Sequence, residues 1–225
     1  MVTYRSVPDN RWHAVHMTSF VLASASPARL GLLRAAGIEP RVVVSEVDED
    51  AVESLARQQD PGLTPRRLAQ LLAEAKGDAV ASRTTDERVR WVLACDSVLE
   101  VDGQVHGKPG TPEVARERWQ QVRGRSAVLH TGHHLVDMRD GRTAGGPASA
   151  TVRFASVTDA EVEGYVATGE PLHVAGGFTL DGLGAPFVES IEGHPSTVVG
   201  LCLPLLRRLL TDLGTDWWSV AQSRA

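Results

Sequence analysis

The chain has 225 residues, of which 42% are hydrophobic and 23% charged, and its formal net charge is −5 at pH 7. This composition is ordinary for one globular domain with a sizeable core, and the acidic balance argues against a general nucleic-acid-binding protein. No apolar run approaches the roughly 18 residues that a membrane-spanning helix requires. Cys95 and Cys202 lie in apolar runs without a disulfide pattern, which indicates reduced thiols and a cytoplasmic protein.

Residues 1–16 lack the apolar core of a signal peptide, and we interpret them as a disordered or artefactual extension. Met17 directly precedes the first apolar run, so we expect a single domain over residues 17–213. Residues 214–225 would then form a peripheral tail.

Residues 20–37 predict a short buried strand, a serine-rich turn and a helix. Ser26 suits the N-cap of this helix, and Pro27 suits its first position. Ser24, Ser26 and Arg29 would then lie at one helix N-terminus, where free amides and the helix dipole favour an anion. The pattern predicts a phosphate site, although an ordinary strand–helix turn with a good cap has the same pattern.

An acidic segment, residues 46–50, follows the strand predicted over residues 39–45. Carboxylates at a strand end suit Mg²⁺ or Mn²⁺, but a solvated acidic loop would have the same composition. Residues 53–63 are expected to form a loop or a frayed helix. A long helix is predicted over residues 64–82, and Lys76 lies near its middle, where a lysine is usually a solvated side chain.

The apolar run Trp91–Cys95 predicts a central strand with Asp96 directly at its end. A carboxylate held there can bind a metal ion or accept a proton from water. A further strand over residues 97–101 and an Asp-Gly turn predict a hairpin that returns the chain to Lys108. We therefore expect Lys108 near Asp96, a pair that suits phosphoanhydride hydrolysis.

The second half of the chain predicts further strands and helices. These are a helix over residues 111–124, strands over 126–137 and 148–157, a helix over 158–168, a strand over 186–191 and a helix from Pro204. His130 and His134 would share a strand face about 13 Å apart, too far for one zinc ion. We therefore expect structural or surface roles for these histidines and for His133. Residues 169–184 are glycine-rich, which is typical of plain loops and of backbone that approaches a ligand closely.

Four stretches of the chain resemble, in the right order, signatures of the Maf family of nucleoside triphosphate pyrophosphatases. They are Ser24-Ala-Ser-Pro-Ala-Arg29, Val47-Asp-Glu49, Cys95-Asp-Ser97 with Gly107-Lys-Pro109, and Gly169-Glu170 through Gly200-Leu-Cys-Leu-Pro-Leu205. The resemblance covers residues from about 20 to 210. It implies an α/β fold of the Maf/ITPase-like type, with a mixed, curved β-sheet, flanking helices and two lobes around a central cleft.

The resemblance also implies a reaction, the hydrolysis of a nucleoside triphosphate between its α and β phosphates as housecleaning of modified nucleotides. Asp96 and Lys108 would be catalytic, with Asp96 as the proton acceptor. Glu49 and Asp96 would bind a divalent metal cation, Mg²⁺ or Mn²⁺. The residues that would bind the phosphates are Ser24, Ser26, Arg29, Lys76 and Lys108.

Ala28, Ser97 and Asp181 depart from the arginine, threonine and glutamine that many family members have at positions associated with base selection. The resemblance therefore supports the reaction and not a particular base, although an aspartate facing the base would favour cytosine- or guanine-type edges. Two alternatives stay open: a nucleotide-binding inhibitor of septum formation that needs no turnover, and a phosphatase that releases orthophosphate. The expected partner is a small-molecule nucleoside triphosphate, with no nucleic acid and no membrane, and the family suggests a homodimer.

Overall fold

The computed structural model describes residues 19–221, so the extension expected over residues 1–16 lies outside the described residues. The strands are β1 (Ser19–Leu22), β2 (Pro40–Val42), β3 (Val89–Val101), β4 (Gln104–His106), β5 (Ser126–Asp137), β6 (Thr143–Phe154) and β7 (Val188–Glu192). The α-helices are α1 (Pro27–Ala35), α2 (Glu49–Gln59), α3 (Pro65–Arg83), α4 (Pro112–Val122), α5 (Asp159–Ala167), α6 (Pro195–Val199) and α7 (Leu203–Asp212). The 3₁₀ segments are η1 (Glu170–His173), η2 (Ala175–Gly177), η3 (Ala185–Phe187) and η4 (Trp217–Ser219). Within the described residues, no helix has both the length and the apolar composition that crossing a bilayer requires.

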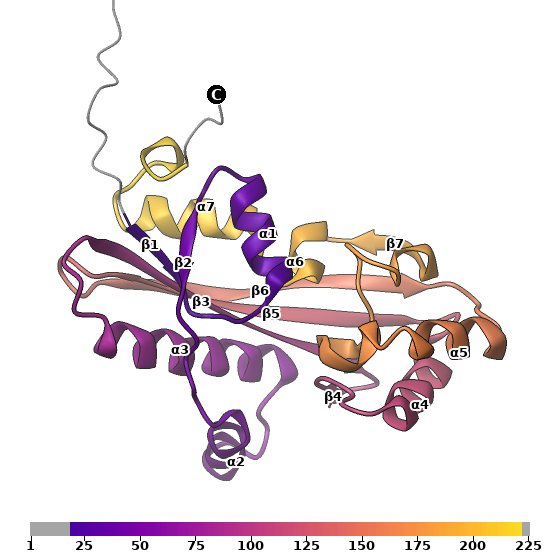
Figure 1. Cartoon of the computed structure of the whole chain (residues 1–225). Helices are drawn as coiled ribbons and strands as arrows, with labels where there is room; N and C mark the ends of the chain where they lie inside the picture. The colour runs from indigo at the N-terminus through magenta and orange to yellow at the C-terminus, as the bar shows by residue number, and fades with distance from the viewer. Residues whose placement is uncertain (1–18, 222–225) are drawn as a thin grey trace, which may run out of the picture.

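The strands form one mixed sheet in the order β2-β1-β3-β5-β6-β7, and β4 pairs with β3 outside this path. β1 runs parallel to β2 and β3, whereas the β3–β5, β5–β6 and β6–β7 pairs are antiparallel. The long strands β3, β5 and β6 extend through the molecule, with α3 on one face and α1 and α7 on the other (Figure 1). The predicted fold class, a mixed α/β sheet with flanking helices, is confirmed.

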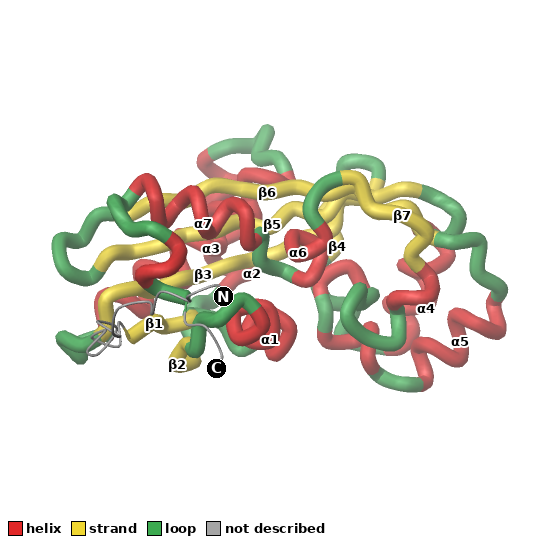
Figure 2. Tube along the Cα trace, turned by 90° about the horizontal axis from the view of Figure 1, so that it is seen from above, coloured by secondary structure: helices red, strands yellow, loops and turns green. Residues whose placement is uncertain are grey.

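Buried apolar side chains form two main clusters. The helices that cover them lie toward opposite ends of the long strands, with α4 and α5 near one end and α7 toward the other (Figure 2). One cluster lies under α4 and α5, where the indole of Trp119 makes edge-to-face contacts with the rings of Phe154 and Tyr165. The other packs β1 and β3 against α1 and α7, with Leu33 and Leu93 fully buried. The molecule therefore has two lobes that share the strands of one sheet.

Four helices begin at the N-caps that the sequence predicts. Ser26, Thr64, Thr111 and Thr158 each accept a hydrogen bond from a backbone amide in the first turn of the helix that follows. The first three are followed directly by a proline, which lacks the amide that the first turn leaves unpaired. Local capping chemistry therefore sets the start of the helices that flank the sheet.

Three sequence-based expectations were wrong. α2 occupies most of the segment expected as a loop or frayed helix over residues 53–63, because Asp48 caps it and sets its start at Glu49. β3 continues through Asp96, since β5 pairs with it on both sides of this residue, so Asp96 lies in mid-strand and not at a strand end. β6 begins at Thr143, earlier than expected, because its glycine-rich first half also pairs with β5.

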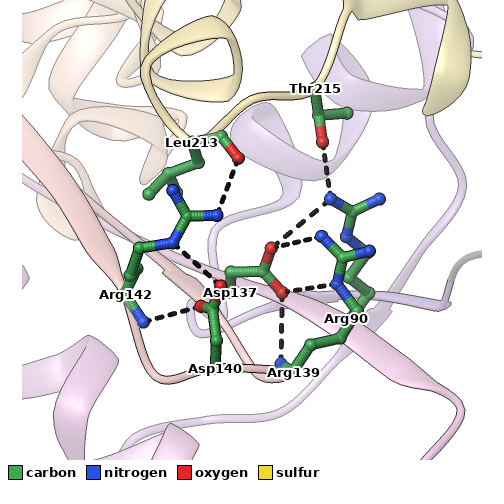
Figure 3. A network of polar contacts seen from close by, with 7 residues as sticks. All are labelled: Arg90, Asp137, Arg139, Asp140, Arg142, Leu213 and Thr215. Carbon is green, nitrogen blue, oxygen red and sulfur yellow. Dashed lines mark hydrogen bonds and ion pairs between the residues drawn. The ribbon is translucent and has the colours of Figure 1, made fainter.

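A polar network around the buried carboxylate of Asp137 ties the segment after α7 to the sheet (Figure 3). The carboxylate of Asp137 is fully buried and accepts a hydrogen bond of 3.4 Å from Arg90. Arg90 also donates to the hydroxyl of Thr215 at 2.6 Å, and Arg142 donates to the carbonyl of Leu213 at 3.2 Å. The chain is thus packed on the sheet beyond residue 213, more closely than a peripheral tail would be.

Candidate active site

The candidate site lies at a gap along one edge of β3. β1 pairs with this edge as far as Leu93, and β4 pairs with it only from Leu99 onward. Among the strands that the structure describes, the residues between pair only with β5, on the opposite edge. Asp96 and Ser97 lie in this interval, which borders a cleft of about 1370 Å³.

Every candidate residue from the sequence lines this one cleft. The residues are Ser24, Ser26, Ala28, Arg29, Glu49, Lys76, Asp96, Ser97, Lys108 and Asp181. They come from turns, helices and strands distributed along most of the chain, and both lobes contribute to the lining. The fold therefore brings together all the side chains that the sequence singles out.

Arg29 ties the turn between β1 and α1 to distant parts of the chain. Its Nη1 donates to Ser24 Oγ at 2.9 Å, its Nε to the carbonyl of Gly200 at 2.7 Å, and its Nη2 to Ser97 Oγ at 3.0 Å. Three of the five guanidinium N–H groups are thus used within the protein. The amide of Arg29 donates to the N-cap hydroxyl of Ser26 at 3.4 Å. A fixed positive charge therefore lies at the N-terminus of α1, as an anion site requires.

The hydroxyl of Ser97 belongs to a directed chain of hydrogen bonds. Ser97 Oγ lies 2.9 Å from Thr131 Oγ1, which itself donates to the carbonyl of Thr197 at 2.9 Å. Because Thr131 has a single hydroxyl proton, Ser97 must be the donor to Thr131 and the acceptor from Arg29. The Ser97 hydroxyl could therefore interact with a ligand only as a hydrogen-bond acceptor.

Glu49, Lys76 and Asp96 form the second polar group of the cleft. The ammonium of Lys76 lies 2.7 Å from Glu49 Oε1 and 2.5 Å from Asp96 Oδ1. The side chains of Lys76 and Asp96 are only 10% and 9% exposed, whereas Glu49, the first residue of α2, is 48% exposed. Lys76 thus bridges the two carboxylates that the resemblance assigns to a metal, an arrangement that the sequence did not predict.

The surroundings of Asp96 favour a role in proton transfer. Burial raises the pKa of the Asp96 carboxyl, the positive charges of Lys76 and Arg29 oppose that change, and the Glu49 carboxylate adds to it. A carboxylate with a raised pKa is a stronger base than an exposed aspartate. Asp96 can therefore accept a proton from water more readily than an ordinary aspartate.

The carboxylates of Glu49 and Asp96 lie close enough together to bind one positive charge between them, which here is the ammonium of Lys76. No group of three or more His, Cys, Asp or Glu side chains is arranged for a metal within the described part of the chain. Mg²⁺, however, is usually held by one or two carboxylates, with water and substrate phosphates completing its octahedron. The donor set therefore fits a hard divalent cation that shares its coordination with a phosphate ligand.

Lys108 lies in the loop between β4 and α4, where a buried arginine supports the neighbouring backbone. Arg118 donates to the carbonyl of Gly107, and the amide of Gly176 donates to the same carbonyl at 3.2 Å. Sequence reasoning missed Arg118; the available signal was an arginine directly before Trp119 on the buried side of α4. It also missed Glu170, which lines the cleft.

The histidines contribute to the fold, as expected. His133 Nε2 accepts the amide of Cys202 at 2.8 Å, and burial lowers the pKa of His133 to about 4, so its ring is neutral. His130 and His134 each hydrogen-bond to a carboxylate of a neighbouring element at 2.8 Å. Both cysteines are buried free thiols.

A family model for Maf-like proteins matches residues 19–213, a range that contains all the candidate residues. The chain belongs to the Maf family. A relative from Salinispora tropica is 56% identical over 205 residues, which cover 88% of this chain and 87% of the relative. A relative from Leifsonia xyli subsp. xyli is 52% identical over 200 residues, which cover 87% of this chain and 93% of the relative. Both Maf relatives are named nucleoside triphosphate pyrophosphatase.

A solved structure of a nucleoside-triphosphatase (dITP/XTP pyrophosphatase) from Mycobacterium abscessus also matches, over 87% of this chain and 96% of that chain. Its TM-score is 0.35 and its sequence identity 12%, which is too low to support an argument. The assignment to the Maf family therefore rests on the sequence match alone.

Proposed function

We propose that this chain is a nucleoside triphosphate pyrophosphatase that cleaves the bond between the α and β phosphates, giving the nucleoside monophosphate and pyrophosphate. The observation that carries the proposal is the cleft, where the anion site at the start of α1 and the Glu49–Lys76–Asp96 group line the same space. Membership of the Maf family and the names of the two relatives support the same reaction.

The phosphates would be held by the positive groups of the cleft. Ser24, Ser26 and the amide of Ala28 in the first turn of α1 would donate to phosphate oxygens, beside the fixed guanidinium of Arg29. Lys108 would add a second positive charge from the β4–α4 loop. These local charges are needed because a triphosphate brings about four negative charges to a protein whose formal net charge is −5.

Asp96 would accept the proton of the attacking water, whose oxygen bonds to the α phosphorus while the bond to the β phosphate breaks and pyrophosphate leaves. Lys76 would move from the carboxylates to a phosphate oxygen through rotation of its flexible side chain. Glu49 and Asp96 are the residues that would hold Mg²⁺ or Mn²⁺. When bound, such a cation would neutralise phosphate charge and polarise the phosphoryl group.

Ala28, Ser97 and Asp181 would select the base. The Ser97 hydroxyl can act only as an acceptor, and Asp181 is an exposed acceptor. Two acceptors favour bases that present amino groups, as cytosine and guanine do. Equal turnover of UTP and CTP would contradict this selectivity.

Three further expectations accompany the proposal. Buried free thiols agree with a reducing compartment, and we propose the cytoplasm. We also propose that residues 17–213 form a single domain and that the protein is a homodimer. Light scattering after size-exclusion chromatography tests the homodimer.

The proposal is tested by a pyrophosphate-release screen over normal and modified nucleoside triphosphates, with Mg²⁺ and with Mn²⁺. We expect release by the wild type and a loss of roughly 10²–10⁴-fold in Asp96→Asn, the usual contribution of a general base. Glu53→Gln is the matched control, because Glu53 lines the same cleft but pairs with Arg57. Wild-type protein that binds triphosphates by calorimetry without releasing pyrophosphate would instead support the septum-formation inhibitor.

A further inference from the structure

Residues 179–184 carry Asp181, and the first four of them line the cleft. This segment contains neither helix nor strand, so no regular backbone ladder holds its shape. Asp181 is exposed and, within the described residues, makes no hydrogen bond or ion pair. Its carboxylate is therefore available to a ligand, provided that the segment is fixed by other contacts.

The carboxylate of Glu170 supplies those contacts. Its Oε1 accepts from Thr179 Oγ1 at 2.5 Å, from Tyr165 Oη at 2.9 Å and from the amide of Gly184 at 3.1 Å. Its Oε2 accepts from the amide of Leu183 at 3.0 Å. One carboxylate thus joins both ends of the segment to Tyr165, which is buried in the aromatic cluster of its lobe.

The segment is also folded tightly around this carboxylate. A Cβ atom at Gly182 would lie 2.6 Å from Glu170 Oε2, and one at Gly184 would lie 2.6 Å from Tyr165 Oη. Partial burial opposes the ionisation of Glu170, but the hydrogen bonds from Thr179 and its other donors lower the pKa overall. An ionised carboxylate is the side chain that accepts four hydrogen bonds without presenting a donor.

We propose that Glu170 is a positioning residue for base recognition, which holds residues 179–184 in the one shape that presents Asp181 to the nucleotide base. We assign it to the base and not to the phosphates, because its donors all lie in residues 165–184 and none of them is a residue proposed to hold a phosphate. This inference rests on the proposed function, since it assigns Asp181 to the base.

The test compares Glu170→Gln with Glu163→Gln, an exposed glutamate of α5 that pairs with Arg116. Calorimetry measures the Kd of a nucleoside monophosphate and that of pyrophosphate, and kinetics measure kcat and KM for triphosphates that differ in base. For Glu170→Gln we expect monophosphate binding weakened about 10-fold, or about 1.4 kcal/mol, with pyrophosphate binding unchanged. KM should rise with little change in kcat, and the discrimination between bases should decrease. Glu163→Gln should match the wild type.

Thr179→Val preserves side-chain shape but removes one donor to Glu170 and one acceptor of the Gly184 amide, which Glu170 still accepts. It should shift the same quantities in the same direction by a smaller factor. If Glu170→Gln does not fold, Thr179→Val takes its place in the same measurements. Equal weakening of monophosphate and pyrophosphate, or unchanged base discrimination, would overturn the inference. A wild type that binds monophosphate but releases no pyrophosphate would overturn the proposed reaction, while the binding comparison still tests Glu170.

Discussion

Gly132 lies on β5 directly opposite Asp96, at the point where α3 crosses the sheet. A Cβ atom at Gly132 would lie 2.2 Å from the carbonyl oxygen of Ala69 and 2.6 Å from the Cα of Gln70. Both are backbone atoms of α3, so the contact can be relieved only by moving the helix away from the sheet. Because α3 also carries Lys76, Gly132→Ala should separate Lys76 from Asp96.

The expected cost follows from the atoms involved. Overpacking a core usually destabilises by about 1–3 kcal/mol, and a clash with backbone atoms places this variant at about 3 kcal/mol. For a domain of this size, that corresponds to a decrease in Tm of about 6–12 °C. A displacement of the catalytic groups by about 1 Å should also lower kcat by about 10²-fold.

The assay combines thermal and urea unfolding with the rate of pyrophosphate release. Gly146→Ala is the control: Gly146 lies on the neighbouring strand β6, and nothing lies within 4 Å of a Cβ at that position. This control should stay within about 0.5 kcal/mol of the wild type, as most substitutions without a steric conflict do. A Gly132→Ala variant with the Tm and kcat of Gly146→Ala would refute the reasoning.

Three further predictions concern charged groups. Asp137→Asn should lower the free energy of unfolding by about 2 kcal/mol at pH 7, because it removes the buried negative charge of the network in Figure 3 and replaces one acceptor oxygen with an amide donor beside the arginine donors. Burial opposes the ionisation of Asp137, but hydrogen bonds from Arg139 lower its pKa overall. The stability that the ionised Asp137 contributes is therefore fully present above the unfolded-state pKa of about 4 and is lost as the pH falls through the lowered folded-state pKa. Urea unfolding of the wild type and of Asp137→Asn between pH 7 and pH 3 checks this prediction. A difference in their free energies of unfolding that does not depend on pH would contradict it. Arg118→Leu should raise KM for the triphosphate while changing kcat by less than about threefold, because it removes one of the two hydrogen bonds that hold the Gly107 carbonyl beside Lys108; unchanged KM in steady-state kinetics would refute this role. The pH dependence of wild-type kcat/KM, which reports the free enzyme, should lose activity with unit slope below an apparent pKa above that of an ordinary aspartate, because burial raises the pKa of Asp96; a midpoint at or below the ordinary value would contradict Asp96 as the base in the cation-free enzyme.

The helix starts could be predicted because their chemistry is local. At Ser26, Thr64, Thr111 and Thr158, the side chain and the amide that it accepts are three residues apart, so the sequence contains both partners. The individual strands could be predicted from apolar runs and turn residues, whereas the mixed sheet was implied by the resemblance to the Maf family. The candidate residues themselves came mainly from the resemblance to the Maf family.

The parts of the site that the sequence did not predict depend on partners far away in the chain. Arg29 is held by the carbonyl of Gly200, 171 residues later. Lys76 is placed between two carboxylates by the packing of α3 on β3, and β5 extends β3 beyond Asp96. Glu170 belongs to a stretch that resembles a Maf signature, but no role could be given to it from the sequence, because its role depends on the folded arrangement of its donors.

The most direct test of the central claim is the identity of the products. The protein is incubated with a nucleoside triphosphate and Mg²⁺ in ¹⁸O-labelled water, and the products are followed by ³¹P NMR. The proposed reaction predicts equal amounts of monophosphate and pyrophosphate, with the label in the monophosphate because water attacks the α phosphorus. Orthophosphate with the diphosphate, or label in the pyrophosphate, would contradict it.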